Sequence, residues 1–187
     1  MFDFIGFRVY KRHEIPGGLS NVDILEALRR KEISVNPWWD GGAPLQPCSI
    51  DLRLGMSYVR VGETEAFLAY EYELQPGECI NGSTLERIRI SPAIKGRVVG
   101  KSSVARLAQG IEEAGLVDPG WDGVLTLELK NPHNKPFKLK YGMPIAQIEF
   151  TRLITPASPA YGDAKLGSHY QGAYTAQASR LDAKWRN

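Results

Sequence analysis

The chain has 187 residues, 43% of them hydrophobic and 24% charged, and a formal net charge of +2. That length is typical of one ordinary domain with a sizeable core, and so small a net charge does not favour a nucleic-acid partner. The two cysteines, Cys48 and Cys79, form no CxxC pair and no disulfide framework, which favours a reduced, cytoplasmic setting. No apolar run is long enough to cross a membrane, and the charged first residues predict no signal peptide.

Composition divides the chain into three segments. Residues 1–19 end in a Pro-Gly-Gly turn, and we expect them to form an N-terminal extension. Residues 20–154 carry the apolar periodicity of a folded domain. Residues 155–187 are rich in Pro, Ser, Ala, Gly and Tyr, so we expect a lid or tail that stays mobile until a ligand orders it.

The folded segment begins with a helix and continues with strands. We expect Ser20 or Asn21 to cap a helix that ends near Lys31, because Asp23 lies in its first turn. Apolar alternation then predicts strands at 50–61, 66–74, 78–80, 85–90, 94–99, 124–130, 137–140 and 145–153. Turn sequences separate them, and one of these is Ile80-Asn81-Gly82. Many short strands with frequent turns predict an all-β barrel or sandwich.

A set of small, hydroxyl and basic residues follows the predicted strand at 94–99. In Gly100-Lys101-Ser102-Ser103 the glycine permits close approach, while the hydroxyls, the N–H groups and the lysine charge suit phosphate oxygens. If Ser102 or Ser103 caps a short helix, Arg106 lies on the same face and can bind a phosphate bidentately. An ordinary surface helix capped by serine would have the same sequence.

Two carboxylates follow within the next 25 or so residues. Asp118 lies in an Asp-Pro-Gly turn, which holds its side chain either against a sugar hydroxyl or against its own turn. Glu128 alternates with leucines that should face the core, so it points the other way, toward solvent or into a pocket. In an enclosed pocket such a carboxylate suits proton transfer.

These residues form the motifs GKSSVAR, AGLVDPGWDG and LTLEL, whose order and spacing resemble those of dCTP deaminases, a family of the trimeric dUTPase-like superfamily. The resemblance covers roughly residues 20–180 and includes segments 45–55, 141–147 and 161–172. It implies an all-β, dUTPase-like distorted β-barrel or jelly roll. A short N-terminal helix and a flexible C-terminal lid, which folds over bound nucleotide, would complete this fold.

The resemblance also implies a reaction, the hydrolytic deamination of dCTP to dUTP and ammonia without a catalytic metal. The chain lacks the HxE and PCxxC elements of zinc deaminases. By match to the family motif, Glu128 would activate the water, while Ser102 and Arg106 would orient it and stabilise the intermediate. Magnesium would arrive with the triphosphate, since it prefers phosphate oxygens and water.

The other residues implied by the resemblance would bind the nucleotide. Asp118 would hold the 3′-hydroxyl, and the backbone of Thr126 and Leu127 would read the base. Gln147 and Tyr161 would hold the triphosphate or the sugar. The remaining members of the implied substrate-binding set are Lys101, Ser102, Ser103, Arg106, Glu128, His169 and Gln171. Sites in this family are shared between subunits, so the resemblance implies a homotrimer, and it leaves open inhibition by dTTP.

Departures from the family pattern keep alternatives open. Ile111-Glu112-Glu113 replaces a segment in which His and Thr commonly lie beside the base, and Lys101 replaces a more usual Arg. Leu116 is typical of bifunctional relatives that also hydrolyse dUTP to dUMP and pyrophosphate. The alternatives are therefore a bifunctional enzyme, a dUTPase alone, or a non-catalytic nucleotide-binding protein. Glu128 argues against the second alternative, and the intact set of site residues argues against the third.

Overall fold

The computed structural model describes residues 15–39, 44–107, 110–111 and 115–181. In these ranges two helices, α1 (Asn21–Arg29) and α2 (Ser102–Ala105), and a short 3-10 helix, η2 (Ala164–Leu166), accompany the strands. The strands are β1 (Gly17–Gly18), β2 (Ile33–Asn36), β3 (Ser49–Arg60), β4 (Phe67–Leu68), β5 (Glu71–Leu74), β6 (Cys79–Ile90), β7 (Ile94–Gly100), β8 (Gly110–Ile111), β9 (Leu116–Val117), β10 (Asp122–Lys130), β11 (Phe137–Lys140) and β12 (Pro144–Arg152).

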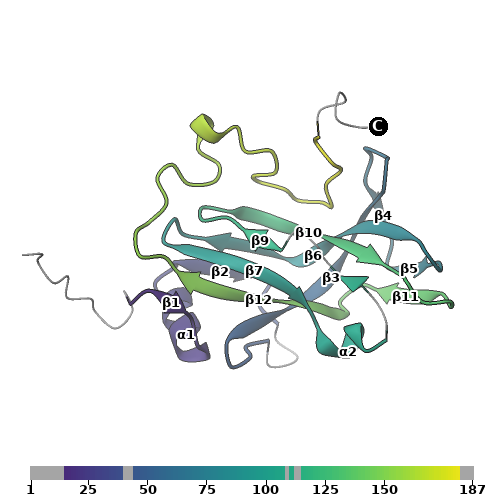
Figure 1. The fold of residues 1–187 in the computed structure, drawn as a ribbon, viewed down its shortest axis with the longest axis horizontal. Helices are drawn as coiled ribbons and strands as arrows, with labels where there is room; N and C mark the ends of the chain where they lie inside the picture. Colours follow the sequence, from purple (N-terminus) through teal and green to yellow (C-terminus); the bar gives the residue numbers. More distant parts are fainter. Residues whose placement is uncertain (1–14, 40–43, 108–109, 112–114, 182–187) are drawn as a thin grey trace, which may run out of the picture.

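The strands form a curled antiparallel sheet (Figure 1). Its central order is β8-β10-β6-β3-β12-β7-β9, and β1, β2 and β4 add to β12, β6 and β3. Strands β5 and β11 form a separate two-stranded sheet. The expectation of an all-β, barrel-like fold is therefore confirmed. Residues 1–14 of the predicted extension lie outside the described residues, and β1 near its end pairs with β12.

The predicted helix is present and begins as expected. The Ser20 hydroxyl accepts a hydrogen bond from the Asp23 N–H, and the Asp23 carboxylate accepts one from the Ser20 N–H. This reciprocal capping box satisfies two of the N–H groups that a helix start leaves without partners. The last helical residue is Arg29, slightly before the predicted end, because Lys31 takes the left-handed conformation at φ 58°.

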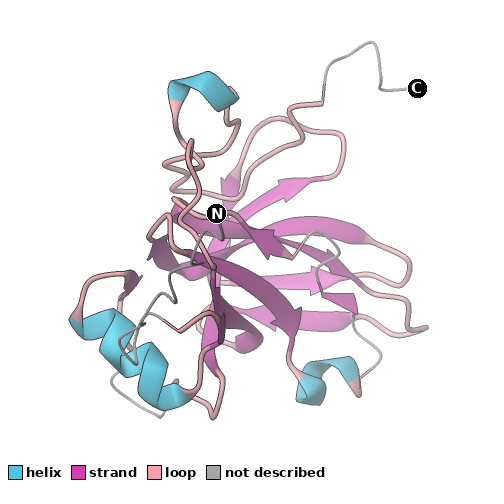
Figure 2. Ribbon diagram, turned by 60° about the vertical axis from the view of Figure 1, so that its left-hand side comes forward, coloured by secondary structure: helices cyan, strands magenta, loops and turns pink. Residues whose placement is uncertain are grey.

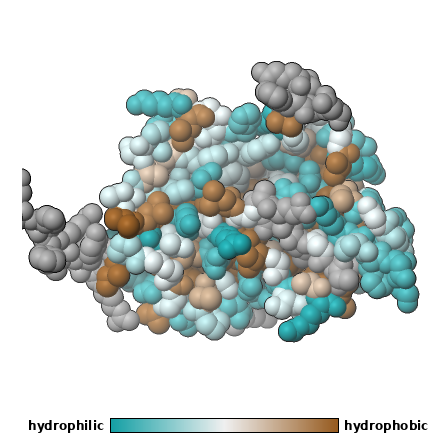
Figure 3. Space-filling view, viewed as in Figure 1, coloured by the Kyte–Doolittle hydropathy of each residue, from teal (hydrophilic) through white to brown (hydrophobic). Residues whose placement is uncertain are grey.

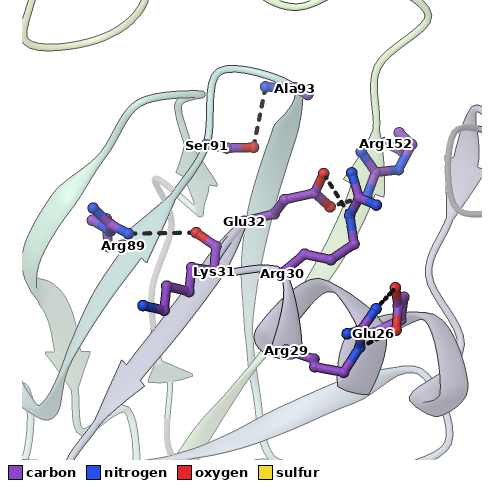
Figure 4. A network of polar contacts seen from close by, with 9 residues as sticks. All are labelled: Glu26, Arg29, Arg30, Lys31, Glu32, Arg89, Ser91, Ala93 and Arg152. Atoms are coloured by element: carbon purple, nitrogen blue, oxygen red, sulfur yellow. Dashed lines mark hydrogen bonds and ion pairs between the residues drawn. The ribbon is translucent and has the colours of Figure 1, made fainter.

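Polar contacts fasten the exit of α1 to the sheet (Figure 4). The Glu32 carboxylate lies 2.5 Å from the Arg152 guanidinium on β12, and both side chains are mostly buried. The Arg89 side chain on β6 donates to the carbonyl of Lys31. The chain leaving α1 is thus held by two strands that are far away in the sequence.

The prediction of two strands at 78–80 and 85–90, with a turn between them, is wrong. Residues Cys79–Ile90 form one continuous strand, β6, that pairs with β3, β10 and β2. A Cβ atom added at Gly82 would lie 2.9 Å from a methyl group of Leu129 and 3.3 Å from one of Leu54. The Asn-Gly sequence therefore serves close packing inside the sheet, and the glycine is needed because neighbouring side chains fill the space where a side chain would go.

Other differences concern short elements. The predicted strand at 66–74 is divided into β4 and β5. Strands β1, β2, β8 and β9 carry too few residues to show a period of their own, so the sequence did not predict them.

The core lies within the curled sheet. Its fully buried side chains include Leu52, Ile88, Leu127 and Ile148, from four neighbouring strands. The face seen in Figure 3 mixes apolar and polar residues, as is normal for a folded chain. No helix in the described ranges is long and apolar enough to span a membrane.

Candidate functional site

A cavity of about 880 Å³ lies where the C-terminal segment passes over β9 and β10. Figures 1 and 2 show this segment as a long loop above the strands. The wall contains six of the residues proposed from the sequence, Asp118, Thr126, Leu127, Glu128, Tyr161 and His169. The volume suits a nucleotide-sized ligand.

Glu128 occupies the wall because of strand alternation along β10. Leu125, Leu127 and Leu129 are buried, at 7%, 0% and 1% exposure, whereas Glu128 faces the cavity and is half-buried. Its Oε2 atom is buried and has no hydrogen-bond partner among the described residues. Buried polar atoms are normally paired, so this oxygen is available to accept a hydrogen bond from a group that enters the cavity.

The Asp118 turn closes one end of the cavity. The Trp121 N–H donates to the Asp118 carbonyl at 3.1 Å, and Gly120 takes φ +97°. A Cβ atom at Gly120 would lie 2.7 Å from the carbonyl oxygen of Tyr161, while the Tyr161 N–H donates to the Pro119 carbonyl at 2.8 Å. The turn and the start of the C-terminal segment are therefore fitted to one another.

Tyr161 and Gln171 hold the C-terminal segment in place. The Tyr161 ring lies 5.5 Å from the Trp121 ring, and its hydroxyl accepts from the Tyr170 N–H at 3.1 Å. The Gln171 amide donates to the Gly120 carbonyl at 3.0 Å and accepts from the Asp122 N–H at 3.2 Å. Gln171 therefore binds the turn and does not line the cavity, unlike Tyr161.

Sequence reasoning missed the wall formed by residues 177–179. The Ala176 N–H donates to the Ser57 hydroxyl and the Gln177 N–H donates to the Thr126 hydroxyl, both at 3.0 Å. These bonds place Gln177, Ala178 and Ser179 at the cavity. The segment has no apolar periodicity, so the sequence carried no signal for its contact with the sheet, in which Ala176 is buried.

The basic and hydroxyl residues lie elsewhere, around α2. This helix begins at Ser102 after Lys101 as the N-cap residue, with no side-chain capping bond, so neither Ser102 nor Ser103, which the sequence offered as caps, is its N-cap residue. Ser102, Ser103 and Arg106 are exposed, and none of them lines the cavity. Figures 1 and 2 place α2 at the end of the sheet away from the C-terminal segment.

Gln147 belongs to this second group. It lies on β12 opposite Asp51 on β3, and its amide oxygen accepts from the Ser49 hydroxyl at 3.3 Å. Asp51 in turn holds the Lys101 ammonium at 2.5 Å. The predicted site residues therefore form two groups in one chain, a cavity group and a group around α2.

The structure describes some of the positions that depart from the family pattern. Glu112 and Glu113 lie outside the described residues, and Ile111 pairs with Leu129 as part of β8. Leu116 lies in the cavity wall and is largely exposed, at 62%. In the described ranges, no group of three or more His, Cys, Asp or Glu side chains is arranged to hold a metal ion.

Comparisons with known proteins agree on one family. Residues 63–153 match the family described as dCTP deaminase-like. A dCTP deaminase of Natronomonas pharaonis is 38% identical over 184 residues, covering 87% of this chain and 94% of that protein. A dUMP-forming dCTP deaminase of Bifidobacterium longum is 41% identical over 175 residues, covering 82% and 89%.

A solved structure agrees in its fold. The 2′-deoxycytidine 5′-triphosphate deaminase of Agrobacterium tumefaciens superposes with a TM-score of 0.62 at 21% identity, over 74% of this chain and 49% of that one. At this level of identity the match concerns the fold alone, and the chain spans about half the length of that structure.

Proposed function

The chain belongs to the dCTP deaminase family, and from this membership we propose that it hydrolyses the 4-amino group of dCTP, giving dUTP and ammonia. The observation that carries the proposal is Glu128, a cavity carboxylate whose buried Oε2 has no partner among the described residues. Such a group is available to a water molecule and a substrate.

Glu128 would work as general base and then as general acid. It takes a proton from water as the water oxygen bonds to C4 of the cytosine, and it passes this proton to N3, giving a tetrahedral intermediate. It then transfers the proton of the new C4 hydroxyl to the 4-amino group, the C4–N bond breaks, ammonia leaves and the C4 carbonyl forms. General acid–base catalysis of this kind contributes about 10²–10⁴-fold to the rate. Ser102 and Arg106 would orient the water and stabilise the charge of the intermediate.

The other cavity residues would select and hold the nucleotide. Asp118, fixed by its turn, would accept from the 3′-hydroxyl, and the backbone of Thr126 and Leu127 would read the base edge. Tyr161 and His169 would cover the sugar and phosphates from the C-terminal segment. The Gln171 amide is occupied by the turn, so its contribution would come through holding that segment on Asp118.

A homotrimer with shared sites explains the separation of the two groups. Glu128 lies in the cavity, whereas Ser102, Ser103 and Arg106 are exposed at the other end of the sheet (Figures 1 and 2). A cyclic assembly can bring the α2 group of one subunit to the cavity of the next. The phosphates would then meet Lys101, Ser102, Ser103 and Gln147 from a neighbouring chain.

Magnesium would bind the triphosphate, because this hard cation prefers phosphate oxygens and water as ligands. Its role would be to neutralise phosphate charge as the nucleotide enters the site. A cytoplasmic location fits the free, exposed thiols of Cys48 and Cys79, which would persist in a reducing compartment. Inhibition by dTTP would follow if that nucleotide competed with the substrate for the same cavity.

A second candidate is a bifunctional enzyme that converts dCTP to dUMP, ammonia and pyrophosphate. Leu116, an apolar and largely exposed residue of the cavity wall, favours it. Dual activity is also in the name of the dUMP-forming relative of Bifidobacterium longum. Asp118 and the residues around α2 would then position a second water at the α-phosphate.

A product assay separates the candidates. The protein is incubated with magnesium and either dCTP or dUTP, and nucleotides, ammonia and pyrophosphate are measured. If dCTP gives only dUTP and ammonia, the protein is a deaminase. If dCTP gives dUMP together with ammonia and pyrophosphate, the protein is the bifunctional form. Turnover of dUTP alone identifies a dUTPase. Binding without turnover of either nucleotide would refute both proposed activities.

Subunit mixing tests the shared site. Glu128→Gln and Arg106→Ala chains are each expected to be nearly inactive, because each lacks one group. Random mixed trimers should recover about a quarter of wild-type activity, since each site draws the two groups from different chains. If both groups came from one chain, mixing would recover nothing. A light-scattering mass near that of a monomer would refute the trimer.

A further inference from the structure

Asp51 on β3 is a buried carboxylate with no role in the reaction described above. It is 7% exposed, and its Oδ1 atom is buried without a hydrogen-bond partner among the described residues. Its Oδ2 atom lies 2.5 Å from the Lys101 ammonium and 3.4 Å from the Gln46 amide nitrogen. The Asp51–Lys101 pair is largely buried, with side-chain exposures of 8% and 22%.

The sheet explains how this pair forms. Asp51 lies opposite Gln147 on β12, and Gln147 lies opposite Val99 on β7. Lys101 follows two residues after Val99, where β7 has ended. The ion pair therefore links the end of β7 to β3, on the other side of β12. Gln147, which lies between them on β12, is neutral, and its amide oxygen accepts from the Ser49 hydroxyl. Asp51 therefore supplies the negative charge that pairs with Lys101.

Lys101 is also the residue from which α2 starts. Its N–H donates to the Ile145 carbonyl at 3.1 Å, and its carbonyl accepts from the N–H groups of Val104 and Ala105. No side chain caps this helix. With backbone and ammonium both held, Lys101 has little freedom, and the direction of the exposed residues that follow it is fixed.

We propose that Asp51 is a positioning residue for the nucleotide triphosphate. It acts through Lys101, which it holds at the start of α2 so that Ser102 and Ser103 face the phosphates. This inference rests on the proposed function, which places the triphosphate against this turn. Asp51 itself touches neither the nucleotide nor the reacting atoms.

A double-mutant cycle on triphosphate binding tests the proposal. Asp51→Asn, Lys101→Met and the double variant are compared with wild type by calorimetry, using dCTP, dCMP and inorganic triphosphate, each with magnesium. Asp51→Asn keeps the shape and removes the charge. It should weaken the binding of dCTP and of inorganic triphosphate about tenfold, and that of dCMP less than about twofold, because only the longer phosphate chain reaches the turn at Lys101. In the Lys101→Met background the same change should have no further effect.

Glu32→Gln provides the matched control. Glu32, just before β2, also forms a largely buried 2.5 Å ion pair with Arg152 on β12 (Figure 4). Loss of this pair should lower the melting temperature, and it should not weaken dCTP binding more than dCMP binding. A selective loss of triphosphate affinity in Asp51→Asn is therefore not a general effect of breaking a buried pair. If Asp51→Asn folds poorly, Lys101→Met removes the same ion pair at a position that is partly exposed.

Three results would overturn the positioning role. They are equal loss of dCTP and dCMP affinity, an undiminished effect of Asp51→Asn in the Lys101→Met background, or the same selective loss in Glu32→Gln. The outcome is separable from the proposed reaction. If wild type deaminates dCTP but the cycle shows no coupling, the positioning role fails alone. If inorganic triphosphate shows the coupling but dCTP is not deaminated, the reaction fails alone.

Discussion

Replacing Glu128 by glutamine should lower the catalytic rate while leaving the folded state equally stable or slightly more stable. The amide keeps the size of the side chain but cannot accept a proton from water. Loss of general acid–base catalysis should lower kcat by about 10²–10⁴-fold, which corresponds to roughly 3–5 kcal/mol of activation free energy. The Kd for dCTP should change less than about threefold, because the carboxylate is not the main contact of the sugar or phosphates.

The same substitution should not destabilise the fold. The Oε2 atom of Glu128 is buried without a partner among the described residues, and an unpaired buried polar atom costs about 1–3 kcal/mol. A neutral amide reduces this cost. In a chain of this length about 1 kcal/mol raises Tm by about 2–4 °C.

The assay combines single-turnover kinetics, calorimetric binding of dCTP and thermal unfolding. Glu73→Gln is the matched control, because Glu73 is an exposed glutamate on β5, in the separate two-stranded sheet. It should change neither kcat nor Tm. The reasoning fails if Glu128→Gln retains kcat within about threefold of wild type, or if it unfolds at a clearly lower temperature than wild type.

Three further substitutions test the fold around the site. Burial raises the pKa of Tyr58 from 10 to about 12; the folded state then holds this proton more tightly, so wild-type stability should fall by about 3 kcal/mol between about pH 10 and pH 12. Denaturant titrations should show that Tyr58→Phe matches wild-type stability at neutral pH and lacks this loss at high pH. If the free energy of unfolding falls equally with pH in both proteins, Tyr58 is not the group responsible. Gly120→Ala places a Cβ atom 2.7 Å from the Tyr161 carbonyl at a positive φ, so it should cost more than about 1 kcal/mol in chemical denaturation and raise KM; an unchanged KM would show that the turn does not position the C-terminal segment. Ser57→Ala leaves the buried Ala176 N–H without its acceptor at a cost of about 1–3 kcal/mol, and limited proteolysis should cut residues 174–179 faster than in wild type, with equal rates as the contrary result.

Strand alternation allowed several features to be predicted from local sequence. The leucines of β10 alternate with Glu128, and burial of the leucines left only one direction for the carboxylate. Ser20 and Asp23 likewise carry a capping pattern that acts within one helical turn. These predictions succeeded because each depends on residues that are near neighbours in the chain.

Local signals misled where a distant residue decided the outcome. Asn81-Gly82 has the sequence of a turn, yet β6 continues through it because Leu129 and Leu54 occupy the space beside the glycine. Ser102 and Ser103 have the side chains that usually cap a helix, but Lys101 occupies the N-cap position of α2, held by Asp51. In both cases a tertiary contact outweighed the local preference.

By itself, the sequence determined the all-β class, the first helix and the strand that carries Glu128, because periodicity is a property of neighbouring residues. The residues that we propose for nucleotide chemistry also came from motif order alone. Only the tertiary structure decided that Gln171 binds the Asp118 turn, that residues 177–179 form part of the cavity wall, and that Lys101 is paired with Asp51. It also divided the site residues between the cavity and α2. The physical reason is that these contacts join segments about 50–120 residues apart, and their geometry depends on strand order and register, which no local pattern encodes.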